Sequence, residues 1–379
     1  HSGARTLPFE APARRGGKGR SEGELVGKAA GARWTLERLE REYILEVLQA
    51  CHGHQIRTAD ILGIDRRTLY RKLKQYKEDG SWTGSDDEQS RESLEEAVAH
   101  GCTFFDTAWG YGEGHSERLL GRIVRSNREA RLFAATKIPP KHRQWPSRRG
   151  DRLEDVFPAD HIRDYTHRSL ENLGFTSIDL MQFHVWEDDW AEDERWQRAV
   201  DDLKREGLVR AFGISVNRWE PWNGIRTLRT GQMDAVQVIY NLFDQAPEDE
   251  LFPACRELDI GVIARVPFDE GSLTGTLTKR SRWPAGDFRN AYFVSENLEP
   301  TVDRVETLKA VLPRGVTLPE LALRFILSND DVDVVIPGMR KAAHVLANVK
   351  ASEAGPLSGD LLRRLRGHRW DRTPTAWSH

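Results

Sequence analysis

Hydrophobic and polar residues follow two different patterns along this chain. From residue 94 onward, short continuous apolar runs alternate with amphipathic segments of helical spacing. Apolar runs of this length predict strands that are buried on both faces, and their alternation with helices predicts a parallel sheet. Because the unit repeats many times, we expect a closed α/β barrel rather than an open sheet. The expected strands cover residues 103–105, 132–138, 178–185, 209–215, 235–240, 261–266 and 332–336.

Between residues 34 and 77 the pattern is helical throughout. Apolar residues recur at helical spacing in residues 36–51, which predicts an amphipathic helix. Two shorter helices are expected at 56–62 and 65–76, with a turn at Gly63 between them. Two short helices that are joined by a glycine turn are typical of a helix-turn-helix.

Composition divides the chain into three parts. Residues 1–32 are rich in glycine, alanine, arginine and proline and contain few large apolar residues, so we expect a disordered linker. Residues 33–77 hold the expected all-α helix-turn-helix domain. A polar segment with Gly80 and Gly84 follows, and residues 78–379 hold the expected barrel domain.

Basic residues are concentrated in the helix-turn-helix. Residues 55–77 contain seven basic residues against two acidic ones, although the whole chain has a formal net charge of -3. Most of them lie on the last helix, which this motif places in the major groove of DNA. A solvated helix face is the alternative interpretation. The basic residues are Arg57, Arg66, Arg67, Arg71, Lys72, Lys74 and Lys77.

Cysteine spacing and hydropathy bear on location and on metal binding. The three cysteines, Cys51, Cys102 and Cys255, show no metal-ligand or redox spacing. We therefore expect reduced thiols, a cytoplasmic protein and no metal site. No apolar run reaches the length of a membrane span and no signal peptide is recognisable, so we expect no interaction with a membrane.

Polar residues stand at the carboxyl ends of successive expected strands. Asp106, Lys137 and His184 lie at or beside three of these ends, and Tyr111 lies on the loop after the first. In a parallel barrel these ends meet at the edge that carries catalytic residues. Each residue alone also has a structural explanation, such as a turn cap or a core histidine. Their shared position favours a common site.

The four residue types together suit the protonation of a carbonyl oxygen. A phenol is a poor acid at neutral pH, but an adjacent ammonium favours its charged form. A carboxylate can hold the ammonium in place, and a histidine can orient the carbonyl oxygen or help to protonate it. This chemistry fits reduction by a hydride-donating cofactor, because neither step needs a nucleophile or a metal.

Two other kinds of site are not expected. Residues 112–117 resemble a dinucleotide fingerprint, but Glu117 stands where the third glycine belongs, so we reject a Rossmann site. A cluster of carboxylates on one loop and helix start could suggest a glycosidase pair. We interpret these carboxylates as solvated, because acidic residues suit the first turn of a helix. They are Glu187, Asp188, Asp189, Glu192, Asp193 and Glu194.

From about residue 80 to the C-terminus, the chain resembles the aldo/keto reductase family. The motifs that carry the resemblance are Phe104–Gly112, Ala135–Lys137, Gln182–His184, Gly213–Asn217, Gln237–Asn241 and Ile336–Arg340. The resemblance implies a (β/α)8 TIM-type barrel and an NADPH-dependent reduction of small aldehydes and ketones to alcohols. The N-terminal hairpin and the first strand of the family have no counterpart here, because the helix-turn-helix takes their place. We therefore expect a barrel that lacks them.

The same resemblance implies roles for individual residues. Tyr111 is implied as the general acid, and Asp106, Lys137 and His184 complete a tetrad. The residues implied at the nicotinamide are Ser215, Asn217, Gln237 and Arg265, the last where many members carry an aromatic residue. Those implied at the pyrophosphate are Pro267, Phe268, Gly271, Ser272 and Leu273. Those implied at the adenosine and its 2′-phosphate are Gly338, Arg340, His344 and Asn348, and a guanidinium also suits a phosphate by its geometry.

A second resemblance covers about residues 34–77. Residues 36–45 and 59–73 are similar to the Fis-type DNA-binding domain of sigma-54-dependent activators. This resemblance implies a homodimer through the helix at 36–51. Since no P-loop motif occurs in the chain, we do not expect the usual activator mechanism. The residues implied to contact DNA are Arg66, Arg67, Thr68, Tyr70 and Arg71.

Three hypotheses follow from these patterns. The first is an NADPH-dependent carbonyl reductase that carries a DNA-binding module. The second is a DNA-binding regulator whose barrel is a sensor of nicotinamide or small carbonyls, or an inactive remnant. The third is a junction of two genes whose barrel half folds poorly.

Overall fold

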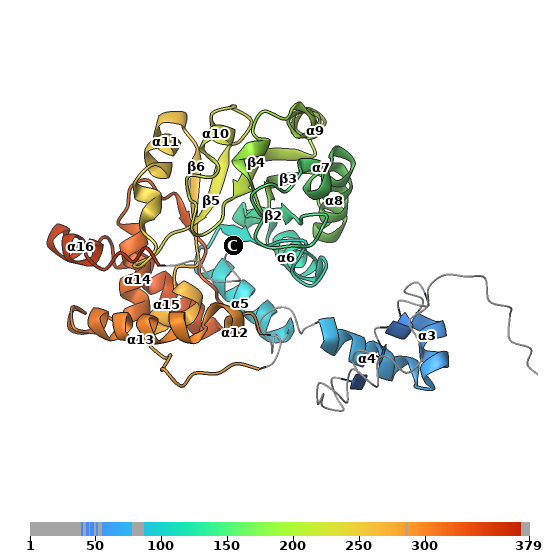
Figure 1. The fold of residues 1–379 in the computed structure, drawn as a ribbon, viewed down its shortest axis with the longest axis horizontal. Coiled ribbons are helices and arrows are strands. Elements are labelled where there is room, and N and C mark those ends of the chain that lie inside the picture. The colour runs from blue at the N-terminus through green and yellow to red at the C-terminus, as the bar shows by residue number, and fades with distance from the viewer. Residues whose placement is uncertain are drawn as a thin grey trace, which may run out of the picture. The chain divides into compact units, whose positions relative to one another are not determined.

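The computed structural model describes residues 39–40, 43–44, 46–48, 51, 55–77, 87–284 and 287–372. The chain divides into two compact units, residues 1–77 and 78–379 (Figure 1). The expected linker at 1–32 lies outside the described residues. Within the described part of the chain, no helix is long and apolar enough to cross a membrane.

The first unit contains the two expected short helices. Helix α3 (Gln55–Leu62) and helix α4 (Arg66–Lys77) are joined by a turn in which Gly63 has a φ of 63°. Asp65 caps α4, because its carboxylate accepts a hydrogen bond of 2.7 Å from the Arg67 N–H. The described residues of the expected helix at 36–51 are helical, except Cys51, which lies in a turn. A small apolar core holds the unit together and consists of Ile44, Ala59, Leu69 and Leu73.

The second unit is built around one parallel sheet of seven strands, which confirms the expected α/β barrel. Each strand pairs with the next one along the chain, as a barrel with repeated strand–helix units requires. The ring is nearly closed: among the described residues, no pairing joins its last strand to its first. The strands are β1 (Phe104–Asp106), β2 (Phe133–Ile138), β3 (Ile178–Phe183), β4 (Val209–Ser215), β5 (Ala235–Ile239), β6 (Gly261–Arg265) and β7 (Val334–Val335).

Helices surround the sheet (Figure 1). Helix α5 (Asp87–Ala99) packs against α6 (His115–Ser126), which follows β1, and against α15 (Ala342–Glu353), which follows β7. The Ser93 hydroxyl of α5 donates a hydrogen bond to the Met339 carbonyl. Helix α5 therefore connects the two ends of the sheet. The other α-helices are α7 (Leu153–Val156), α8 (Ala159–Leu173), α9 (Glu194–Arg205), α10 (Ile225–Leu228), α11 (Leu251–Leu258), α12 (Arg289–Tyr292), α13 (Ser295–Lys309), α14 (Leu318–Leu327) and α16 (Gly359–Arg366).

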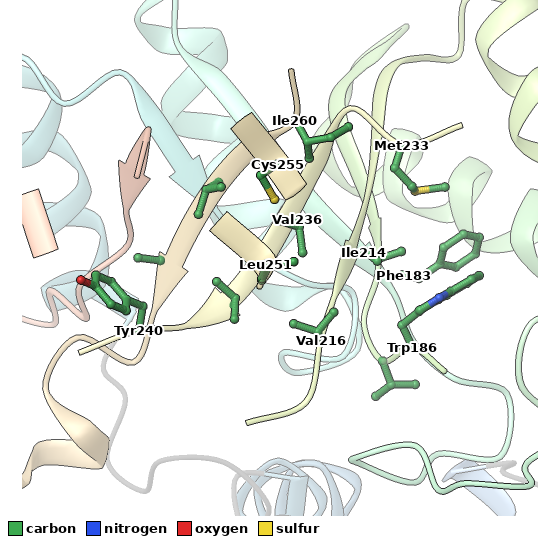
Figure 2. Packing of buried hydrophobic residues seen from close by; sticks show 14 of the residues in the cluster. Phe183, Trp186, Ile214, Val216, Met233, Val236, Tyr240, Leu251, Cys255 and Ile260 are labelled. Atoms are coloured by element: carbon green, nitrogen blue, oxygen red, sulfur yellow. The ribbon is translucent and has the colours of Figure 1, made fainter. Parts of the chain in front are cut away.

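The main apolar core lies between the strands and this layer of helices (Figure 2). Its aromatic centre is Phe183, whose ring centroid lies 4.7 Å from that of Phe157 and 5.0 Å from those of Trp186 and Phe212. Rings of this size contribute much of the buried apolar area. A second, smaller cluster packs together from β2, β3, β5 and β6 and consists of Ala135, Leu180, Ala235 and Ile263.

Candidate active site

The register of the strands brings polar residues to one end of the barrel. Lys137 of β2 lies opposite Gln182 of β3, and Ser215 of β4 lies opposite Gln237 of β5. Asp106 is the last residue of β1. Since all strands are parallel, these residues share the carboxyl-terminal edge, where barrel enzymes place their chemistry.

Asp106 and Lys137 form a buried ion pair. The Lys137 ammonium contacts the Asp106 carboxylate, and it also donates a hydrogen bond of 2.8 Å to the Thr107 carbonyl. Only 1% of the lysine side chain and 8% of the aspartate side chain are exposed. A buried charge is costly unless it is paired and hydrogen-bonded, so each residue of this pair fixes the other.

Two glutamine amides complete the surroundings of Asp106. The Gln182 amide donates to Asp106 Oδ1 at 3.2 Å, and the Gln237 amide donates to the same oxygen at 2.9 Å. The sequence indicated a role at the nicotinamide for Gln237 but none for Gln182. The position of Gln182 at a strand end, just before His184, was the signal that could have found it.

Tyr111 and His184 lie beside this ion pair. Their rings meet edge to face with centroids 5.8 Å apart, and the Lys137 ammonium lies 5.6 Å from the centre of the Tyr111 ring. The Tyr111 side chain is 45% exposed. Burial, together with the charges of Lys137 and Arg265, lowers the pKa of His184 well below its ordinary value, so the imidazole is neutral at pH 7. The four predicted tetrad residues are thus gathered at one place.

Trp145 was not predicted as a site residue, yet it covers His184 from another side. Its ring lies edge to face with the His184 ring at a centroid distance of 5.7 Å. The tryptophan is 38% exposed and belongs to the loop between β2 and α7. Gly110 lies against both rings. His184 is thus flanked by Tyr111 and Trp145, which are both exposed to solvent.

Asn217 is tied to two residues that the sequence did not indicate as partners. Its amide nitrogen lies 3.3 Å from the Ser147 hydroxyl and 3.4 Å from a Glu187 carboxylate oxygen. The Ser147 hydroxyl lies 2.8 Å from the same Glu187 oxygen. Burial raises the pKa of Glu187, and hydrogen bonds from Asn223 and Ser147 oppose that rise. Ser215, which the resemblance also implied at the nicotinamide, is the last residue of β4 and is buried.

The expectation that the carboxylates at 187–194 are solvated is wrong for two of them. Glu187 and Asp188 are buried. Asp188 accepts hydrogen bonds from the Thr227 N–H at 2.9 Å and from the Arg226 N–H at 2.8 Å, so it caps the start of α10. These partners come from distant parts of the sequence, which is why a local pattern could not reveal them. Asp193 does cap α9, because it accepts from the Arg195 N–H.

Arg265 lies at the end of β6, on the same edge of the barrel. Its guanidinium donates a hydrogen bond of 3.1 Å to the Val216 carbonyl. Burial and the neighbouring Arg218 lower the pKa of Arg265. Its Nε is buried without a partner among the described residues.

The segment implied at the pyrophosphate follows β6. Three non-glycine residues in it have a left-handed backbone: Val266, Asp269 and Glu270, with φ values of 55°, 46° and 54°. The Phe268 carbonyl accepts hydrogen bonds from the N–H groups of Gly271 and Leu273, and the Ser272 hydroxyl donates to Asp269 at 2.7 Å. Pro267, Ser272 and Leu273 are buried, whereas Phe268 and Gly271 are partly buried.

The residues implied at the adenosine lie on the loop after β7 and on the first turns of α15. Gly338, Arg340 and His344 are exposed. Asn348 stands one helical turn after His344, so the two share a face of α15. The Asn348 amide nitrogen is buried and has no partner in the described part of the chain.

In the first unit, the residues implied to contact DNA lie on α4. Arg66, Arg67 and Tyr70 are exposed, and Thr68 is partly buried. The side chain of Arg71 is not among those that the structure describes. Neighbouring Lys72 is instead engaged within the unit, because its ammonium lies 2.7 Å from the Glu40 carboxylate.

No metal centre is visible in the described ranges, which contain no group of three His, Cys, Asp or Glu residues that could hold an ion. The barrel and the polar residues at its carboxyl-terminal edge are typical of the barrel enzymes. The profile of the aldo/keto reductase family matches residues 76–369, and this chain belongs to that family of oxidoreductases. A second profile, described as bacterial regulatory protein, Fis family, matches residues 35–76.

Individual relatives agree with the family profile. An NADH-specific methylglyoxal reductase of Escherichia coli is 30% identical over 281 residues, which cover 72% of this chain and 85% of the relative. An aldo-keto reductase of Schizosaccharomyces pombe, named for NADP(+), is 28% identical over 282 residues, or 71% of this chain and 81% of the relative. The solved holo form of an aldo-keto reductase from Bacillus halodurans superposes with a TM-score of 0.61 at 25% identity, over 78% of this chain and 92% of that one.

Proposed function

We propose that the barrel is an NADP(H)-dependent reductase that converts small aldehydes and ketones to alcohols. The observation that carries this proposal is the buried Asp106–Lys137 pair beside Tyr111 and a neutral His184. These groups can protonate a carbonyl oxygen without forming a covalent bond to the substrate. Membership of an oxidoreductase family supports the same chemistry.

Tyr111 is the residue we assign to proton transfer. Its half-exposed phenol is accessible to a carbonyl compound. The Lys137 ammonium, 5.6 Å from the ring centre, stabilises the negative charge that remains on the phenol oxygen after the proton leaves. Asp106 holds the ammonium in this place, and the two glutamine amides hold Asp106.

His184 orients the substrate in this proposal. A neutral imidazole has one nitrogen that donates and one that accepts a hydrogen bond. The Nδ1 of His184 is buried without a partner among the described residues. The backbone N–H of His184 donates to the Ile138 carbonyl at 3.1 Å, which fixes the residue beside β2. The ring can therefore hydrogen-bond a carbonyl oxygen that accepts the proton of Tyr111.

The residues assigned to the cofactor fit a dinucleotide by their polarity. Arg265 Nε and Asn348 Nδ2 are buried donors without a partner in the described ranges, and such donors are costly unless a ligand or water pairs with them. A side chain at Gly338 would meet open space, so the backbone there is accessible. NADPH would supply the hydride, while Arg340, His344 and Asn348 would hold its adenosine and 2′-phosphate.

Turnover by the full chain tests this proposal. We would measure oxidation of NADPH and of NADH with methylglyoxal and with an aromatic aldehyde. Tyr111→Phe should lower kcat by about 100-fold or more, since a general acid contributes roughly 10²–10⁴-fold. Binding of NADPH by this variant should remain unchanged. A chain that binds neither cofactor, or a variant with the original kcat, would contradict the proposal.

A second function, sequence-specific DNA binding by a homodimer, is favoured by the helix-turn-helix unit. Helix α4 presents Arg66, Arg67 and Tyr70 to solvent, as a helix that enters the major groove requires. In this proposal the helix at 36–51 forms the dimer. A regulator whose barrel is only a sensor is the alternative. This alternative predicts that NADPH changes the affinity of the chain for DNA and that the chain consumes no aldehyde.

A further inference from the structure

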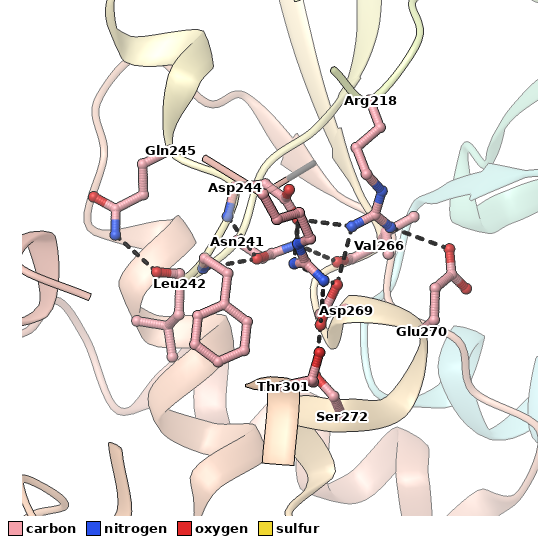
Figure 3. A network of polar contacts seen from close by, with 12 residues as sticks. Arg218, Asn241, Leu242, Asp244, Gln245, Val266, Asp269, Glu270, Ser272 and Thr301 are labelled. Carbon is pink, nitrogen blue, oxygen red and sulfur yellow. Dashed lines mark hydrogen bonds and ion pairs between the residues drawn. The ribbon is translucent and has the colours of Figure 1, made fainter. Parts of the chain in front are cut away.

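The loop after β6 is held by a buried network of charged and polar side chains from four other segments. Figure 3 shows part of this network around Asp269. Asp269 is fully buried. Its carboxylate accepts from Arg218 Nη1 at 3.0 Å, from Arg372 Nη2 at 3.0 Å and from the Tyr292 hydroxyl at 2.8 Å. Asp244, after β5, lies 2.9 Å from Arg218 and 3.4 Å from Arg372. Both arginines therefore join the loop after β5 to the loop after β6.

Arg372 lies far from the barrel strands in sequence, yet it is as buried as the core. Its guanidinium lies over the Trp370 ring at 4.4 Å and donates to the Tyr292 hydroxyl at 2.8 Å. The backbone N–H of Trp370 donates to the Phe243 carbonyl at 2.9 Å. This C-terminal segment, residues 370–372, is thereby attached beside the loop after β5, and Arg372 extends from it to Asp269.

The backbone that Asp269 belongs to needs such support. Val266, Asp269 and Glu270 have positive φ values, which are unfavourable for residues with a side chain and most of all for a β-branched one. Strained backbone persists only where the surroundings impose it. The Asn241 amide adds one more contact, because it donates to the Val266 carbonyl at 3.1 Å. The network is therefore what imposes the shape of this loop.

A role in general stability does not explain the network well. Buried ion pairs commonly add little compared with apolar side chains of the same volume. Here the charges converge on one loop, and that loop carries the residues that we assign to the pyrophosphate, Phe268, Gly271 and Ser272 among them. Glu270, in the same loop, lies 3.4 Å from Arg218, so the guanidinium offsets a negative charge that would repel a phosphate.

We infer that Arg372 is a positioning residue for the dinucleotide. Together with Arg218, it holds the loop after β6 in the form that receives the pyrophosphate. The C-terminal segment 370–372 is thus part of the cofactor-binding machinery, although it contributes no residue to the tetrad. This inference rests on the proposed use of NADP(H), and the experiment separates the two.

The test compares two reduced cofactors in the full chain. NADPH contains the pyrophosphate and the adenosine, whereas reduced nicotinamide mononucleotide contains only the half that carries the hydride. Arg372→Gln should raise the KM for NADPH by about tenfold with little change in kcat, and should change kcat/KM for the mononucleotide by less than about twofold. Arg372→Lys keeps the positive charge but lacks the planar guanidinium with its several donors. It should therefore restore only part of the affinity for NADPH.

The matched control is Arg369→Gln. Arg369 stands directly before the segment 370–372 and pairs with Asp249 at 2.7 Å, away from the loop after β6. This variant should keep the KM for NADPH of the unmodified chain. Should Arg372→Gln fail to fold, Tyr292→Phe removes at nearly constant volume the hydroxyl that donates to Asp269 and accepts from Arg372. This variant should raise the KM for NADPH by about twofold to threefold.

Two results would overturn the inference. One is an Arg372→Gln protein that folds and keeps the original KM for NADPH. The other is an equal loss with NADPH and with the mononucleotide, which indicates a general structural defect. If the unmodified chain used neither cofactor, the proposed function itself would fail, and this outcome is recognised before any variant is made.

Discussion

Gln237 of β5 reaches across the barrel to Asp106 of β1, where its amide donates a hydrogen bond of 2.9 Å to the carboxylate. The two strands are not neighbours in the sheet. The resemblance implied Gln237 as a nicotinamide contact, and the structure adds a link to the Asp106 carboxylate of the proposed tetrad. One side chain thus connects the two halves of the proposed site.

Removal of this amide should affect turnover more than cofactor binding. Gln237→Leu leaves the Asp106 carboxylate with one hydrogen bond fewer, and a bond to a charged group contributes about 1.5–3 kcal/mol. We expect kcat to fall by about tenfold or more, because Asp106 then holds Lys137 less firmly. Steady-state kinetics at saturating NADPH measure the effect. An unchanged kcat together with a raised KM for NADPH would show that only the nicotinamide contact matters.

Loss of Lys137 should destabilise the barrel. Lys137→Met leaves Asp106 buried without its counter-ion, and breaking a buried pair in this way costs about 3–5 kcal/mol. Lys204→Met is the matched control, because the Lys204–Asp234 pair, at 2.7 Å, is partly exposed and such pairs contribute about 1 kcal/mol or less. Urea unfolding of both variants gives the comparison. An equal decrease in the free energy of unfolding in both variants would contradict the conclusion that burial makes the Asp106–Lys137 pair more important.

The depressed pKa of His184 predicts a pH dependence of stability. The folded chain keeps His184 neutral at pH values below 6.5, at which the unfolded chain protonates it. The unfolded state then binds more protons, so the free energy of unfolding decreases as the pH falls from 6.5 toward the lower pKa of the folded state. The slope is at most about 1.4 kcal/mol per pH unit. His184→Asn should remove this component, and equal slopes in both proteins would contradict it.

DNA binding should depend on Arg66 and Arg67. Alanine at either position should weaken binding to a pool of random duplexes, and each lost phosphate contact should reduce the slope of log affinity against log salt by about 0.9. Fluorescence anisotropy at several salt concentrations measures both quantities. Arg122→Ala, an exposed change on α6 of the barrel, is the control. Binding that is weak and insensitive to salt in the unmodified chain would refute this function.

The gathering of Asp106, Lys137 and His184 could be predicted from the sequence because these residues lie at or beside strand ends. Continuous apolar runs predicted where β2 and β3 end, and the barrel geometry then placed Lys137 and His184 on one edge. Strand ends were accurate to a few residues: β7 covers only Val334–Val335 of the expected 332–336. Periodicity predicts which face of an element is buried, and this was sufficient for the fold.

Contacts between loops could not be predicted in the same way. Glu187 and Asp188 looked like solvated acids, because a run of carboxylates before a helix usually is solvated. Their partners come from other segments: Ser147 and Asn223 lie on loops, and Thr227 lies on α10. No periodicity links such positions. The network of Arg218 and Arg372 was missed for the same reason, since the interacting residues are up to 128 positions apart.

Ser147 offers a final test of how the loop contacts support the cofactor. Ser147→Ala removes a donor from the buried Glu187 carboxylate, which should cost about 1–3 kcal/mol of stability. It also removes the nearest partner of the Asn217 amide, at 3.3 Å. With Asn217 less restricted, the KM for NADPH should rise by about threefold to tenfold at nearly constant kcat. Thr166→Val is the matched control: it removes a buried hydroxyl that donates to the Ile162 carbonyl within α8, away from the site. It should lower stability without changing the KM. A rise in KM of the same size in both variants would show that loss of stability alone, and not the orientation of Asn217, explains the effect.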